Sequence, residues 1–138
     1  MELDKSSFSF DSYNIYSLNF DIDSLKQDNI NINVLLDDLS YQKIKNENNE
    51  LVGSLDLTLN LEGETSENKK RFLSLKIIGY FSAKNFDENK FEDFCKLNGL
   101  MNLLSIARSF ISSTTAQMGI PPLILPLLNI NSSFEQKK

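Results

Sequence analysis

The chain has 138 residues and a formal net charge of −5 at pH 7. This length fits a single domain over residues 1–138, with 1–9 and 132–138 predicted to be flexible ends. The negative charge argues against nucleic acid or an anionic membrane as the main partner. The longest apolar run, residues 120–128, is too short to cross a bilayer, and Met1 begins no signal peptide. We therefore expect a cytoplasmic protein that does not insert into membranes.

Four segments alternate apolar and polar residues with the period of two that is typical of β-strands. Short connections between successive strands favour antiparallel pairing, so we predict a four-stranded antiparallel meander over residues 12–83. The last strand carries apolar residues on both faces, which indicates that both faces are at least partly covered. The predicted strands lie within residues 8–22, 30–45, 54–61 and 71–83.

A helical region follows the strands. Asp87 and Glu88 begin it, and Gly119 with the two prolines after it ends it. The apolar arc of the long amphipathic helix spans about 220°, more than packing on one sheet requires. We therefore predict a second apolar neighbour for this helix, namely another copy of the chain. Strands followed by a long helix and an apolar extended C-terminal segment make the fold class α+β.

The residues carry no recognisable catalytic chemistry. Histidine is absent, cysteine occurs once, and the five glycines are scattered singly rather than gathered in a phosphate-binding loop. The acidic pairs at 37–38 and 92–93 are interpreted as solvated surface groups. We predict no enzyme, no cofactor and no metal. Arg108 lies at the margin of the apolar arc, either as an anchor for a carboxylate or carbonyl across an interface or as a surface arginine.

Three stretches in the second half of the chain are informative together. They are the glycine–aromatic stretch at residues 79–82, the Ala-Arg-x-x-Ile pattern at 107–111, and the series Gly119, Pro122, Leu123, Leu125, Pro126 and Asn129. With the order of strands and helix, they resemble the SecB family of protein-export chaperones over residues 10–131. Because the chain ends at Lys138, we expect a SecB-like relative whose C-terminal helix is short or missing.

The resemblance implies an ATP-independent holdase that binds unfolded polypeptide clients in apolar surface grooves, with the export ATPase SecA as a further possible partner. It also implies a homotetramer, a dimer of dimers with the long helices between sheets. The candidate client-binding residues are Tyr13, Tyr16, Phe72, Ile78, Tyr80, Phe91, Phe94, Leu123 and Leu125. The candidate interface residues are Leu103, Ile106, Arg108 and Phe110.

Three alternatives stay open. The protein could serve one dedicated partner, such as a component of a toxin–antitoxin system. It could be an acyl-thioester enzyme of the hot-dog type that depends on Glu92 or Asp93, although such a fold places its helix between early strands. It could also bind a small ligand on the concave face of the sheet, which predicts one closed pocket rather than open grooves.

Overall fold

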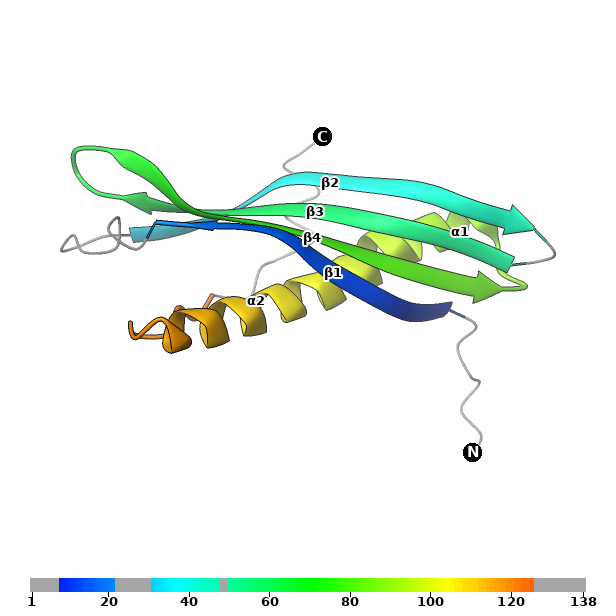
Figure 1. Ribbon diagram of the computed structural model, residues 1–138. Coiled ribbons are helices and arrows are strands. Elements are labelled where there is room, and N and C mark those ends of the chain that lie inside the picture. Colours follow the sequence, from blue (N-terminus) through cyan, green and yellow to red (C-terminus); the bar gives the residue numbers. More distant parts are fainter. Residues whose placement is uncertain (1–7, 22–30, 48–49, 126–138) are drawn as a thin grey trace, which may run out of the picture.

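The computed structural model describes residues 8–21, 31–47 and 50–125. One antiparallel sheet is covered on one face by a nearly continuous helix (Figure 1). The elements are β1 (Phe8–Phe20), β2 (Asn31–Glu47), β3 (Glu50–Glu64), β4 (Lys69–Lys84), α1 (Glu88–Phe94), the π-helical turn η2 (Cys95–Gly99) and α2 (Leu100–Gln117). β1 begins inside the terminal segment that we predicted to be flexible.

The sheet order is β1-β4-β3-β2, with every neighbouring pair antiparallel. The strands β2, β3 and β4 follow one another as a meander, but β1 pairs with β4 rather than with β2. Reaching the far edge requires a crossing of about 14 Å. The connection, residues 21–30, can span roughly 30 Å, so it does not force β1 and β2 to be neighbours. Phe8 and Phe10 stack on Phe81 of β4, which favours this edge.

Two bulges keep the apolar residues of β1 on the helix side of the sheet. These residues fall at even positions, then odd positions, then even positions again, so strict alternation would place them on both faces. The register shifts between Phe10 and Ser12 and again between Ile15 and Ser17. Each shift reverses the alternation once. The side chains that therefore share the helix-facing side are Phe8, Phe10, Tyr13, Ile15, Leu18 and Phe20.

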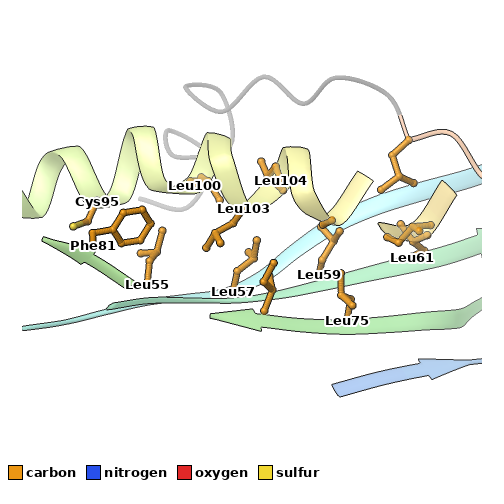
Figure 2. Close-up of a cluster of buried hydrophobic side chains, with 14 of the residues drawn as sticks. Leu55, Leu57, Leu59, Leu61, Leu75, Phe81, Cys95, Leu100, Leu103 and Leu104 are labelled. Atoms are coloured by element: carbon orange, nitrogen blue, oxygen red, sulfur yellow. The ribbon is translucent and has the colours of Figure 1, made fainter. Parts of the chain in front are cut away.

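The hydrophobic core lies between the sheet and the helix (Figure 2). The third strand contributes leucine at every second position from Leu55 to Leu61, and all four of these leucines are fully buried. Leu75, Ile77 and Phe81 continue the same layer on β4. From the helical side the core receives Phe91, Cys95, Leu100, Leu103, Leu104, Ala107 and Ile111. The predicted inward positions of β3 and β4 are thereby confirmed.

The helix begins at a cap and makes its closest approach to the sheet at a glycine. Asp87 is the N-cap, and its Oδ1 accepts hydrogen bonds from the backbone N–H groups of Asn89 at 2.8 Å and Lys90 at 3.3 Å. Near the join of η2 and α2, a Cβ at Gly99 would lie only 2.7 Å from Cζ of Phe81. The absence of a side chain therefore lets the helix lie directly against the Phe81 ring.

The helix ends where the sequence predicts. Gly119 has φ of +83°, and its N–H donates to the Ala116 carbonyl at 3.1 Å. The N–H of Ile120 donates to the Thr115 carbonyl at 3.4 Å. This pair of bonds is a Schellman motif, in which glycine adopts the left-handed conformation at low cost. Residues 120–125, here called the strap, then turn back along α2.

Candidate functional site

A surface groove of about 420 Å³ lies between β1 and α2. Tyr13 and Ile15 line it from the strand, and Ile106 and Phe110 line it from the helix. Three serines of α2 complete the lining: Ser105, Ser109 and Ser113. The groove therefore brings together Tyr13, which the sequence assigned to client binding, and Ile106 and Phe110, which it assigned to a subunit interface.

The register of β1 explains why Tyr13 faces this groove. Tyr13 pairs with Gly79 and Ile15 pairs with Ile77, so both side chains point to the helix side. A Cβ at Gly79 would lie 2.9 Å from Cδ2 of Leu103. Because Gly79 has no side chain, Leu103 packs directly over β4, and α2 lies close enough to β1 to form a groove rather than an open cleft.

The helix side of the groove combines apolar and polar side chains. Ile106 and Phe110 are half-buried and lie one turn apart, so they form an apolar floor with Ile15. The three serines repeat every four residues and are exposed, so they form one stripe beside that floor. Hydroxyl groups can donate and accept hydrogen bonds. The groove can therefore bury apolar side chains while its polar wall bonds to the backbone of an extended chain.

A second apolar surface, here called the outward stripe, follows the helical segments α1, η2 and α2 and is exposed to solvent. It consists of Phe94, Leu97 and Met101, which are 38%, 44% and 56% exposed. The Phe94 ring packs against Phe8 and Phe86, with ring centroids 5.5 and 5.3 Å apart. This packing fixes one end of the stripe. Three large exposed apolar side chains on the consecutive helical segments α1, η2 and α2 indicate a contact surface.

Three predicted client-binding residues lie on the opposite face of the sheet. Tyr16 occupies the second bulge of β1 and donates its hydroxyl hydrogen to Oδ1 of Asp56 in β3 at 2.7 Å. Burial, this hydrogen bond and the charges of Asp56 and Asp38 raise the pKa of Tyr16 to about 12, so its phenol is neutral at physiological pH. Ile78 and Tyr80 alternate with the core residues of β4 and are half-buried. The predicted client residues therefore do not form one continuous site.

Several predicted site residues are buried in the chain's own core, which corrects their assignment. Phe72, Phe91 and Leu125 are 2%, 0% and 4% exposed, so no client can reach them in this conformation. Leu103, predicted for the subunit interface, is fully buried over Gly79. Phe72 packs edge-on against Phe20 at 6.2 Å. Apolar periodicity indicated that these residues are covered, but the cover is their own chain.

The structure shows which of the two predicted roles Arg108 has, an anchor for a carboxylate or carbonyl or a surface arginine. Its Nε–H donates to the carbonyl oxygen of Leu125 at 3.1 Å. The anchored group is thus a carbonyl, as one interpretation predicted, but it belongs to the same chain rather than to a partner. In the last turn of α2, Thr115 Oγ1 accepts the N–H of Leu123 at 2.9 Å. Leu123 itself is half-buried against the core.

The sequence reasoning missed the serine stripe and Thr115, and it did not single out Leu97 as a surface residue. The serines carry a signal that could have been used, since their spacing of four places them on one helix face. Thr115 carries none, because a threonine near a helix end is common and its bond to Leu123 depends on the strap turning back. Met101 is 56% exposed, which shows that the apolar surface of the helix extends past the core.

Several titratable groups of the described residues make structural contacts. Asp37 accepts hydrogen bonds from Asn60 Nδ2 and from Arg71 Nη2, and Glu92 pairs with Lys96 at 3.1 Å. Burial, followed by the charge of Glu92, raises the pKa of the Cys95 thiol to about 12. No group of three or more metal-ligating side chains occurs among the described residues. In the same part of the chain, no helix is long and apolar enough to span a membrane.

Comparisons with known proteins find a distant relative by sequence and likenesses among the solved structures. No model of a protein family matches the chain. It is 29% identical over 131 residues to the uncharacterized protein MJ0357 of Methanocaldococcus jannaschii, covering 91% of this chain and 81% of that protein. A protein of unknown function from Streptococcus agalactiae matches with a TM-score of 0.44 and 13% identity over 87% of this chain and 97% of that one, too low to carry an argument.

The informative structural likeness is to Rv1957 of Mycobacterium tuberculosis, a SecB-like chaperone solved in complex with a ChAD peptide from the Rv1956 HigA1 antitoxin. The TM-score is 0.58 at 9% identity, and the match covers 88% of this chain and 91% of that chain. At this identity the likeness shows the fold alone. The predicted α+β fold, with a four-stranded antiparallel sheet and a long C-terminal helix, is therefore confirmed, and it matches the fold of this structural neighbour.

Proposed function

We propose that this protein is an ATP-independent, chaperone-like protein that binds extended apolar segments of non-native polypeptides. The observation that carries the proposal is the open groove between β1 and α2. It has an apolar floor and a hydroxyl-lined wall on a rigid scaffold, and it holds no cluster of catalytic side chains among the described residues. The fold it shares with a peptide-binding SecB-like chaperone supports the same conclusion.

The groove is suited to modest affinity and broad specificity. Fully burying one apolar side chain contributes about 1.5–3 kcal/mol, so two or three client side chains offset much of the cost of ordering an extended segment. Tyr13 and Phe110 supply ring surface, which contacts many apolar side chains with little selectivity. Capture of this kind is reversible and needs no nucleotide.

A dedicated partner is the second candidate. The structural neighbour was solved with a peptide from an antitoxin, which favours a peptide ligand of one defined source. Binding of several unrelated unfolded proteins with similar affinity would support the general chaperone. Tight binding to one partner alone would support the dedicated one. Participation in export and binding of SecA remain predictions of the family resemblance.

Self-association is part of the proposal. The outward stripe of Phe94, Leu97 and Met101 leaves large apolar side chains in water. Packing this stripe against a second copy would cover them and would place helices between sheets, as the resemblance implies. Leu103 does not take part, since it is buried beneath its own sheet.

The proposed function is tested by suppression of aggregation with several chemically unfolded reporter proteins. Tyr13→Ser removes an exposed ring from the groove, and Tyr16→Ser is the matched control from the same strand, on the opposite face. We expect the Tyr13 variant to bind clients about tenfold more weakly, a loss near 1.4 kcal/mol. The Tyr16 variant should bind as the wild type does. Equal effects of the two changes, or no suppression by the wild type, would overturn the proposal.

A further inference from the structure

The strap is held to α2 by side chains rather than by a backbone ladder. Between the strap residues 121–125 and the other described residues, no backbone–backbone hydrogen bond is formed. Its two polar anchors are the Thr115 hydroxyl, which accepts the N–H of Leu123, and the Arg108 guanidinium, which donates to the carbonyl of Leu125. Two prolines carry no N–H, and Ile124 is 79% exposed. The strap therefore packs on the surface of the fold, and its residues 121–125 form no backbone–backbone hydrogen bonds to the other described residues.

The two anchors match the length of an extended tripeptide. Thr115 and Arg108 are seven residues apart, which corresponds to about 10.5 Å along an α-helix. The path from the N–H of Leu123 to the carbonyl of Leu125 covers three residues, about 10 Å when extended. Thr115 and Arg108 together form a site, here called the seat. The seat binds an N–H group and the carbonyl group two residues later in a chain that runs antiparallel to α2.

A hydrogen bond within the helix orients the Thr115 hydroxyl of the seat. The Thr115 hydroxyl donates to the Ile111 carbonyl at 2.8 Å, which leaves its oxygen free to accept an N–H from outside the helix. Thr115 is 1% exposed. Its partner is Leu123, and the side chain of Leu125, two residues further along the strap, is 4% exposed. The seat therefore combines backbone recognition with one deep apolar position and one shallower position, the latter filled by Leu123.

We propose that this seat is a second peptide site and that the strap is its displaceable occupant. The foreign ligand is an extended segment with leucine-like side chains at alternate positions, because that is the pattern the strap presents. Its backbone groups replace those of Leu123 and Leu125 at Thr115 and Arg108. This inference rests on the proposed function, since it assigns a second site to the same class of ligand. The attached strap competes at a high effective concentration, so the seat of the wild-type chain is mostly filled.

Peptide binding by fluorescence anisotropy tests the inference. The probe is a labelled peptide with the sequence of residues 119–125, and the control peptide carries serine in place of both leucines. Leu125→Ser in the protein removes the side chain that docks the strap but leaves both anchors in place. Because an occupied seat lowers the apparent affinity by the fraction of open molecules, we expect this variant to bind the probe about tenfold more tightly than the wild type. Adding Thr115→Val should reverse the gain, and the control peptide should bind neither protein.

Unchanged probe affinity in Leu125→Ser would overturn the inference. If that variant does not fold, hydrogen exchange of the wild type decides the matter. The Leu123 amide should exchange far faster than the amide of Leu57 in the central sheet, because the strap opens locally. Equal exchange of the two amides would show that the strap leaves only on global unfolding, which contradicts the proposal. Dimers of the wild type that disappear in Leu125→Ser would assign the seat to the strap of a second copy instead, and would also overturn it.

The outcome is separable from that of the proposed function. If Leu125→Ser suppresses aggregation as the wild type does and gains no affinity for the probe, the groove between β1 and α2 accounts for client binding and the strap is only structural. If neither protein suppresses aggregation, the proposed function fails whatever the strap peptide does.

Discussion

Replacement of Gly99 by alanine tests how closely the helix packs on the sheet. Gly99 has helical dihedral angles, φ −63° and ψ −44°, so its backbone does not require glycine. Helix propensity alone therefore predicts that Gly99→Ala stabilises the protein by about 1 kcal/mol. However, the new Cβ would lie 2.7 Å from Cζ of Phe81, whose ring is fully buried and stacks on Phe8 and Phe10.

The steric cost of the new Cβ against Phe81 should exceed the gain in helix propensity. Overpacking a core costs about 1–3 kcal/mol, so after subtracting the gain in propensity we expect a net loss near 1 kcal/mol. For a chain of this size the melting temperature should fall by about 3 °C. Urea unfolding followed by far-ultraviolet circular dichroism measures the change, with Asn102→Ala at an exposed helical position as the control. That control should be neutral or slightly stabilised. A rise in stability of Gly99→Ala by about 1 kcal/mol would refute the close packing of helix on sheet.

Three further predictions concern the strap, alkaline pH and assembly. Thr115→Val leaves the Leu123 N–H without its acceptor and should lower the free energy of unfolding by about 1–2 kcal/mol, whereas the neighbouring Thr114→Val should change it little; equal losses would contradict the anchor. Burial raises the pKa values of Tyr41 and Cys95 to about 12, above those of the unfolded chain, so stability is complete below pH 9 and should fall as the pH rises toward 12. Tyr41→Phe should flatten that decline in urea titrations, and an unchanged slope would argue against desolvation of the partly buried Tyr41 phenol. Met101→Glu places a charge in the outward stripe and should reduce the mass measured by light scattering; an unchanged oligomer would show that the stripe is not the contact.

The sheet and helix could be predicted because their signals are local. Alternating leucines from Leu55 to Leu61 must share one face of a strand, and that face is the core. Gly119 before two prolines must end a helix, and its positive φ agrees. The partner of β1 could not be predicted in this way. The connection after Phe20 is long enough to reach either edge of the sheet, so the choice depends on packing of Phe8 and Phe10 against β4.

The site was harder to predict because apolar residues look alike whether a client or the chain itself covers them. Phe91 and Tyr13 are both aromatic and both are followed by a polar residue, yet Phe91 is fully buried and Tyr13 is 47% exposed. The broad apolar arc of α2 did indicate a second neighbour. Part of that neighbour is the strap, which contributes the buried Leu125 to the same core cluster. A segment that turns back over a helix leaves no periodic signal in the sequence.

Site-specific photo-crosslinking tests the central claim most directly. A photoreactive phenylalanine derivative is placed at Tyr13 in the groove, and in a matched protein it is placed at Glu67, in the exposed connection between β3 and β4. Both proteins are irradiated with the same unfolded reporter polypeptide and then with the same reporter after folding. If the groove binds extended apolar segments, the probe at position 13 should crosslink to the unfolded reporter and not to the folded one, and the probe at position 67 should crosslink to neither. Equal crosslinking at the two positions, or none at position 13, would contradict the account.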